Sequence, residues 1–189
     1  MIERIPPHSS EAEQSLLGAL LIDNQAWEKV ADVVGPRDFY KGAHRVIYEQ
    51  VELLIASNQP ADLTTVSQAL DERQMLDGIG GFAYLAAFAT NVPSALNIRR
   101  YAELVKEKAT QRSLARIGGE IVDGAMAPNA DVDVLIEDSE RKIFDLHQRR
   151  IVKPPVTFKQ ILGRVFDWID NRYHSARREL PGISTGVRK

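Results

Sequence analysis

Apolar residues recur every three or four positions through most of the chain, which is the spacing of one face of an α-helix. The first such run covers Leu16 to Leu21. It follows the segment Ser10–Glu13, whose first and last residues are typical of a capping box at the start of a helix. No segment alternates apolar and polar residues as a half-buried β-strand would. The pattern therefore predicts an all-α fold.

The first half of the chain is predicted to hold five short helices separated by turn-forming residues. Together they predict a small globular head over residues 1–92. After the helix that starts at Ser10, the remaining four are expected over residues 24–34, from about Ala43 to Ser57, from Asp62 or Thr64 to Gln74, and over Phe82–Phe88.

Two longer helices are predicted after Pro93, and they form an antiparallel hairpin over residues 93–148. The first runs to about Gly124, and the second begins at the cap candidate Asp131. Their apolar stripes are wider than two helices can bury in each other, so the hairpin is predicted to self-associate. The candidate residues for this contact are Leu104, Ile117, Ile121, Leu135 and Phe144.

Residues 149–157 contain two adjacent prolines, which favour an extended linker. The next segment, 158–180, has apolar residues at helical spacing and is expected to form an amphipathic linker helix that packs on another domain or subunit. Residues 181–189 follow this helix. The candidate interface residues of the linker helix are Phe158, Ile161, Leu162, Val165, Phe166, Trp168 and Ile169.

Charge is distributed unevenly within the net value of -2. Residues 1–90 hold 6 basic and 13 acidic side chains, residues 91–148 hold 8 and 10, and residues 149–189 hold 10 and 3. An acidic head is a poor partner for nucleic acid, because affinity for the phosphate backbone depends on Lys and Arg. A DNA-binding regulator with a helix-turn-helix at Thr64–Leu70 is therefore only a minor alternative.

The residues that usually carry out catalysis or bind metals are sparse or scattered. The sequence has no cysteine, which excludes disulfides and thiolate metal sites. No catalytic, cofactor-binding or metal-binding residue is expected, and acidic pairs such as Glu11 with Glu13 are interpreted as helix caps or solvated faces. Four histidines lie in different predicted elements without metal-ligand spacing, so a hydrolase is disfavoured and surface or partly buried structural roles are expected for His8, His44, His147 and His174.

The N-terminus lacks the features of a signal peptide, and no apolar run approaches the roughly 18 residues needed to cross a bilayer. The sequence therefore predicts a cytoplasmic protein without a membrane partner.

Several sequence blocks, taken in their order and spacing, resemble the DnaB family of bacterial replicative helicases over about residues 5–185. Each block is unspecific alone, and the argument depends on finding all of them in register. The blocks are Glu11–Leu20 with Asp23-Asn24, Asp38-Phe39-Tyr40, His44-Arg45, Gln59–Asp62, Ile79–Ala86 and Pro93–Ile98.

The resemblance implies an N-terminal collar that self-associates through its hairpin as dimers, with a trimer of dimers in the hexamer. It also implies docking of primase, contact of the linker helix with the motor domain of a neighbouring subunit, and possible contact with a helicase loader. The alternative is a free-standing truncated relative that acts as an adaptor or modulator of helicase or primase.

In this family a RecA-like motor uses ATP and magnesium to unwind DNA in the 5′–3′ direction, and the full-length assembly contacts DNA. Residues 180–186 resemble the entry to that motor, whereas residues 187–189 do not resemble its usual continuation. The P-loop pattern G-x-x-x-x-G-K-[ST] does not occur in the 189 residues. ATP hydrolysis and unwinding are therefore not assigned to these residues, and no cofactor is expected to bind them.

Overall fold

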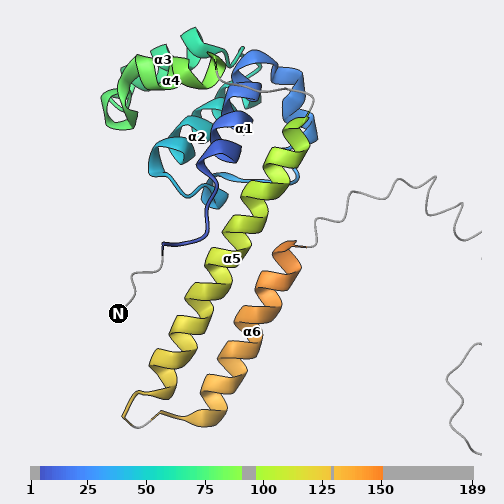
Figure 1. Cartoon of the computed structure of the whole chain (residues 1–189), viewed down its shortest axis with the longest axis vertical. Coiled ribbons are helices and arrows are strands. Elements are labelled where there is room, and N and C mark those ends of the chain that lie inside the picture. Colours follow the sequence, from blue (N-terminus) through green and yellow to red (C-terminus); the bar gives the residue numbers. More distant parts are fainter. Residues whose placement is uncertain (1–4, 91–96, 129, 151–189) are drawn as a thin grey trace, which may run out of the picture. The chain divides into compact units, whose positions relative to one another are not determined.

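A computed structural model of the chain describes residues 5–90, 97–128 and 130–150 (Figure 1). Within these ranges all regular structure is helical and no strand occurs, which confirms the predicted all-α fold. The α-helices are α1 Ser10–Ile22, α2 Gly42–Ala56, α3 Leu63–Glu72, α4 Gly81–Thr90, α5 Ile98–Ala125 and α6 Val132–Arg150, and the 3-10 helices are η1 Asn24–Lys29, η2 Pro36–Asp38 and η3 Asp77–Ile79.

Helix α1 is capped by Ser9, whose hydroxyl accepts a hydrogen bond from the Ala12 N–H at 3.3 Å. The predicted capping box of Ser10 and Glu13 is therefore wrong. Glu13 turns inward instead of back toward the cap, and its side chain is buried. The helix is buried over most of its circumference, because α2, α4 and α5 all pack against it.

The second predicted helix is also different in the structure. A short 3-10 helix, η1, ends at Lys29, and turns lead from there to Val34. The Asn24 side-chain amide donates to the Leu20 carbonyl at 2.7 Å and to the Ala61 carbonyl, and its oxygen accepts from the Ala61 N–H. These hydrogen bonds compete with a regular helix at this point. Val30 and Val34 nevertheless reach the core, as their apolar spacing predicted.

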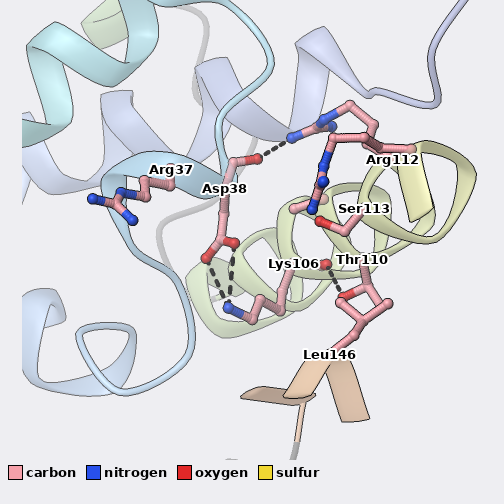
Figure 2. Close-up of a pocket in the computed structure, with 9 residues that line it drawn as sticks. Arg37, Asp38, Lys106, Thr110, Arg112, Ser113 and Leu146 are labelled. Carbon is pink, nitrogen blue, oxygen red and sulfur yellow. Dashed lines mark hydrogen bonds and ion pairs between the residues drawn. The ribbon is translucent and has the colours of Figure 1, made fainter. Parts of the chain in front are cut away.

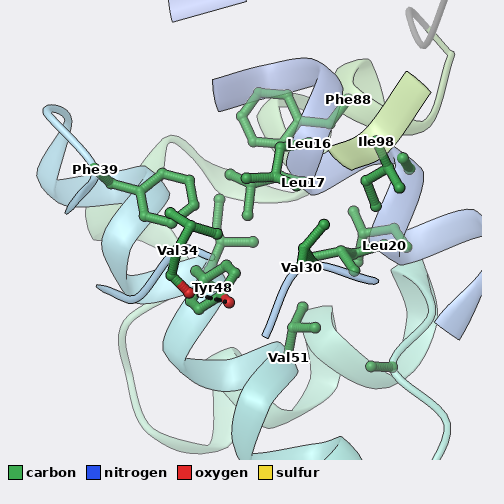
Figure 3. Packing of buried hydrophobic residues seen from close by; sticks show 14 of the residues in the cluster. Leu16, Leu17, Leu20, Val30, Val34, Phe39, Tyr48, Val51, Phe88 and Ile98 are labelled. Atoms are coloured by element: carbon green, nitrogen blue, oxygen red, sulfur yellow. Dashed lines mark hydrogen bonds between the residues drawn. The ribbon is translucent and has the colours of Figure 1, made fainter. Parts of the chain in front are cut away.

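The core of the head is formed by residues of α1, α2 and the turns that connect them, together with residues of α3, α4 and the first turns of α5 (Figure 3). Phe39 and Tyr48 are its largest fully buried side chains, and their rings pack at 4.9 Å. The Tyr48 hydroxyl donates to the Val34 carbonyl at 2.9 Å, so the buried phenol has a partner. Burial raises the pKa of Tyr48 well above its ordinary value, and the charges of Glu52 and Asp38 add to the effect.

The turn before α4 requires glycine. Gly80 has φ of 109°, in the left-handed region that other residues avoid, and a Cβ at this position would lie 3.1 Å from the Tyr84 Cβ and Cγ atoms. The turn predicted at this glycine cluster therefore also fixes how closely Tyr84 approaches the backbone.

Helices α5 and α6 form the predicted antiparallel hairpin, and α6 lies along the C-terminal part of α5 (Figure 1). Asp131 caps α6 as expected, because its carboxylate accepts from the N–H groups of Asp133 and Val134. The head and the hairpin belong to one unit that spans Met1–Val152. Helix α6 includes the first two residues of the linker predicted at 149–157, and the rest of that linker and the linker helix predicted at 158–180 lie outside the described residues. In the described part of the chain, no helix is both long and apolar enough to span a bilayer.

Candidate interaction surfaces of the head and the hairpin

A buried polar network joins three helices of the head. Glu13 of α1 and His44 of α2 are almost completely buried, and the Glu13 Oε2 atom lies 2.6 Å from the His44 Nδ1 atom. Because a carboxylate accepts hydrogen bonds, His44 Nδ1 carries the proton, and Nε2 lies 2.9 Å from the Tyr84 hydroxyl on α4. The cap position predicted for Glu13 is wrong, and His44, for which the sequence predicts a surface or partly buried structural role, is instead fully buried in this network.

The same carboxylate fixes the loop before α2, since Glu13 Oε1 accepts from the Tyr40 N–H at 2.7 Å. Burial alone would raise the pKa of Glu13, but the His44 hydrogen bond, the backbone N–H groups of Tyr40 and Lys41, and the charge of His44 together hold it below its ordinary value. Glu13 therefore remains a carboxylate at neutral pH and stabilises the position of Tyr40.

The head is fastened to the hairpin by Arg112 of α5. Its guanidinium donates to the Pro7 carbonyl at 2.9 Å and to the Asp38 carbonyl, and it lies over the Tyr40 ring at 5.6 Å. Nearly two turns earlier on α5, Lys106 pairs with the Asp38 carboxylate at 2.9 Å. These contacts hold the η2 turn of the head against α5.

A cavity of about 220 Å³ opens at this junction, and Figure 2 shows the side chains around it. Basic residues of η2 and α5 surround it, together with the hydroxyls of Thr110 and Ser113 and with Leu146 from α6. We call it the junction cavity. Its basic residues are Arg37, Lys106, Arg112 and Arg116.

The two hairpin helices close on a narrow line of contact. Ile117 of α5 is buried, and Leu135 of α6 is half-buried near the turn. Leu135 lies so close to Gly124 that a Cβ there would stand 2.7 Å from its Cδ1 atom. Lys142 of α6 adds a cross-hairpin ion pair, with its Nζ atom 3.0 Å from the Glu120 Oε2 atom.

The residues predicted to mediate self-association differ in how exposed their side chains are. Leu104 packs against the core of the head, Ile117 lies inside the hairpin, and Ile121 and Leu135 are half-buried. Phe144 is 59% exposed and is therefore fully available to a partner. The self-association of these residues remains a prediction, and most of them contribute to closing the hairpin in the single chain.

A set of apolar side chains lies outside the contact between the two hairpin helices, and of these residues only Ile121 was among the self-association candidates from the sequence. Leu114 and Ile121 of α5, and Val132, Ile136 and Ile143 of α6, are half-buried or exposed. The position of each residue around its helix axis can be compared with that of the contact residue, which is Ile117 in α5 and Leu135 in α6. At 3.6 residues per turn, all five residues are rotated by roughly 40–100° from the contact residue, and in the same direction. In antiparallel helices this displacement places them on one side of the hairpin. We call them the hairpin apolar face.

The opposite side of the hairpin is mainly charged. Arg116 and Glu120 of α5 and Asp138 and Arg141 of α6 lie on that side and form ion pairs along each helix. Val134 is the exposed apolar side chain there. A groove of about 510 Å³ runs from Leu114 along α5 to Val33 of the head, and the residues between these two are charged or polar. The hairpin apolar face is therefore one-sided and does not continue along this groove.

The signal that could have found this face was present in the sequence. Val132, Ile136 and Ile143 follow one another at helical spacing, as do Leu114 and Ile121. The sequence did not show which residues of α5 and α6 contact each other. This contact decides which apolar positions remain exposed to solvent. The seven candidate interface residues of the linker helix, from Phe158 to Ile169, lie outside the described residues.

Side chains that could ligate a metal ion do not gather in the described part of the chain, where no group of three or more His, Asp or Glu residues has the required arrangement. The candidate interaction surfaces among residues 5–90, 97–128 and 130–150 are the hairpin apolar face and the junction cavity.

Comparison with known proteins shows which family has this fold and sequence. The family of the DnaB-like helicase N terminal domain matches residues 5–107. The replicative DNA helicase DnaB of Haemophilus influenzae is 42% identical over 189 residues, covering 96% of this chain and 40% of that protein. The replicative DNA helicase DnaB of Geobacillus stearothermophilus is 36% identical over 184 residues, again covering 40% of its length. The chain thus spans about 40% of the length of these curated relatives.

Solved structures agree with this result. The crystal structure of the N-terminal domain of DnaB helicase from Mycobacterium tuberculosis has 35% identity and a TM-score of 0.70, and it covers 75% of this chain and 99% of that chain. A DnaB-like replicative helicase, described with its interactions with primase, has a TM-score of 0.65 over 94% of this chain and 38% of that chain, and its 23% identity shows a shared fold. The resemblance inferred from the sequence blocks is confirmed, and the chain belongs to the family of DnaB-like helicase N-terminal domains.

Proposed function

We propose that this chain is an assembly and docking scaffold of a replicative helicase, working in the cytoplasm during DNA replication. The observation that carries the proposal is the one-sided hairpin apolar face. On α6, its members Ile136 and Ile143 are 52% and 47% exposed. They lie on the same side of the hairpin as Leu114 of α5. Contiguous exposed apolar surface of this kind marks a protein interface.

The proposed occupant of the face is a second copy of this chain. A surface that pairs with its own copy is brought together by two-fold symmetry, so each apolar residue meets the partner's face rather than water. The closed hairpin buries only its inner line, at Ile117 and the half-buried Leu135, and leaves the face uncovered. Dimers formed in this way are the proposed unit from which the hexamer is built.

Primase is the proposed docking partner of the assembled scaffold, and the motor domain of a neighbouring subunit is the proposed partner of the linker helix. The first proposal follows from the family and from the solved structure of a helicase of this fold that concerns its interactions with primase. ATP-dependent unwinding is proposed for the whole helicase, and contacts with DNA and with a helicase loader are proposed for the same assembly.

The test is the solution mass of the 189-residue chain and of two variants, measured by light scattering. We expect the wild-type mass to be an even multiple of 21.1 kDa. Ile136→Glu should shift it to 21.1 kDa, because a carboxylate in the interface would lose its hydration without gaining a partner. The matched control is Val134→Glu, two residues away on the charged side, where the native side chain is 60% exposed.

A wild-type monomer at all concentrations would contradict self-association, and equal effects of the two variants would contradict the proposed face. Primase docking is tested separately by adding the helicase-binding domain of a cognate primase. A complex whose mass includes the primase domain is expected, and an unchanged mass would contradict docking while leaving the dimer result intact.

A further inference from the structure

The junction cavity collects more positive than negative charge. Its lining includes the cations of Arg37, Lys106, Arg112 and Arg116 and one carboxylate, Asp38. Lys106 is neutralised by Asp38, with distances of 2.9 and 3.2 Å from its Nζ atom to the two carboxylate oxygens. Arg116 pairs with Glu120 one turn further along α5.

Two guanidinium charges remain without a bonded carboxylate within the described part of the chain. Arg112 is held by the Pro7 and Asp38 carbonyls and by the Tyr40 ring, which orient its donors but carry no full negative charge. Arg37 is exposed at the rim and forms no ion pair with another described residue. The cavity thus keeps a local excess of positive charge within an otherwise acidic head.

Hydroxyl donors complete the lining. Ser113 lies one residue beyond Arg112 and turns toward the cavity (Figure 2). Thr110 also lines it, although its hydroxyl donates to the Lys106 carbonyl at 2.8 Å. A cluster of guanidinium groups with a nearby hydroxyl matches an anion with several oxygens, because each planar guanidinium presents two donors to adjacent oxygen atoms.

We propose that the junction cavity binds phosphate groups, supplied either by a small phosphorylated molecule or by the backbone of single-stranded nucleic acid. Arg37, Arg116 and Ser113 are the binding residues, and Arg112 supplies fixed positive charge behind them. A volume of about 220 Å³ accommodates a phosphate or pyrophosphate group together with its ordered water.

The position of the cavity keeps it available in the proposed dimer. Along α5, Arg116 and Ser113 lie on the other rotational side of the Ile117 contact line from Leu114 and Ile121. The junction cavity and the hairpin apolar face are therefore on opposite sides of the hairpin. This inference does not rest on self-association, since every lining residue belongs to one chain.

The net charge of residues 1–90 gave no indication of this site in the sequence. Residues 1–90 are acidic in sum, which argues against phosphate binding by the head, but three of the four cavity cations come from α5. Folding brings these cations beside Arg37 of η2. Local charge at the cavity is the relevant quantity, because screening in physiological salt limits the effect of exposed charges beyond about 8 Å.

The test is isothermal titration calorimetry of the 189-residue chain with sodium pyrophosphate. We expect one saturable site per chain, and an affinity at least about tenfold weaker in the double variant Arg37→Gln/Arg116→Gln, because charge-assisted hydrogen bonds are lost. The matched control, Arg99→Gln/Arg100→Gln, removes the same charge from exposed arginines of α5 that do not line the cavity. Its affinity should stay within about twofold of the wild-type value.

Oligo(dT) with and without a 5′ phosphate distinguishes the sources of the phosphate group. Displacement of pyrophosphate by both oligonucleotides indicates the nucleic-acid backbone. If the unphosphorylated oligonucleotide does not displace it, the site takes terminal phosphates or small phosphorylated molecules. Either result supports the proposal.

Three results would overturn the phosphate site. They are the absence of saturable binding up to about 10 mM pyrophosphate, an equal loss in both double variants, and tighter binding of a hexaglutamate peptide than of pyrophosphate. The last result would assign the cavity to the carboxylates of an acidic protein. Thermal melting of each variant shows that it is folded, which is expected because the Arg116 side chain is 64% exposed and Arg37 is also exposed.

Discussion

Gly124 and Leu135 touch across the turn of the hairpin, so closely that a Cβ on Gly124 would stand 2.7 Å from the Leu135 Cδ1 atom. Gly124 lies in the last turn of α5, and Leu135 lies in the first turns of α6. The absence of a side chain on one helix thus allows the leucine of the other to fill the space. This contact sets the spacing of the helices beside the turn.

Two glycines of α5 should respond differently to alanine. Gly118→Ala places the new Cβ in open space, so we expect stabilisation of up to about 1 kcal/mol from helix propensity. Gly124→Ala gains the same helix propensity, but its new Cβ forces Leu135 to shift. The free energy of unfolding of Gly124→Ala should therefore be lower than that of Gly118→Ala. Urea denaturation measures both values. Equal stabilisation by the two changes would show that the Leu135 contact does not constrain the hairpin.

Replacement of the buried carboxylate of Glu13 should destabilise the head strongly. Glu13→Gln leaves His44 and the Tyr40 N–H without their charged partner, and the loss is expected to be roughly 3–5 kcal/mol at neutral pH. Glu11→Gln is the matched control, because Glu11 is in the same turn of α1 and is exposed. Its effect should stay within about 0.5 kcal/mol.

The effect of Glu13 should also depend on pH. The pKa of Glu13 in the folded protein lies below its ordinary value of 4.5, so its contribution is fully present above that value. The contribution falls as the pH drops through the folded pKa. The difference in unfolding free energy between wild type and Glu13→Gln should therefore shrink in acid. A difference that is constant from about pH 7 to about pH 3 would contradict this ionisation.

Position 112 should require the guanidinium group of arginine, because a positive charge alone should not be sufficient there. Arg112→Lys keeps the charge, but a single ammonium cannot donate along both directions to the Pro7 and Asp38 carbonyls while also covering Tyr40. We expect a loss of about 1.5 kcal/mol in the free energy of unfolding. Arg99→Lys, at an exposed position of the same helix, should be close to neutral. An unchanged stability of Arg112→Lys would mean that charge alone holds the junction.

Much of this architecture followed from periodicity. The start of α6 at Asp131, the glycine turn before α4 and the hairpin itself were predicted, because capping residues, glycine and helical spacing act locally. The segment after Asn24 was predicted wrongly as a full helix. Asn24 binds Ala61, a residue far away in the sequence, and no local pattern indicates such a contact.

The candidate surfaces were harder to predict for the same reason. Leu104 and Phe144 have similar apolar character in the sequence, yet one packs on the head and the other is exposed. The junction cavity depends on Arg37 and Arg116, which come together only when η2 packs on α5. Helical spacing predicts which residues share a face, but the packing of one helix on another determines which face remains free.

The burial of α1 on nearly all sides affects how the protein folds during its synthesis. Helix α1 leaves the ribosome before its packing partner α5, which is translated only after α2, α3 and α4. Until α5 emerges, the side of α1 that packs on α5 cannot be covered, and the hydrogen bond from Arg112 to the Asp38 carbonyl of the η2 turn cannot form. The nascent head therefore exposes apolar side chains of α1 until α5 has been synthesised. At this stage the exposed apolar surface available to chaperones would be largest.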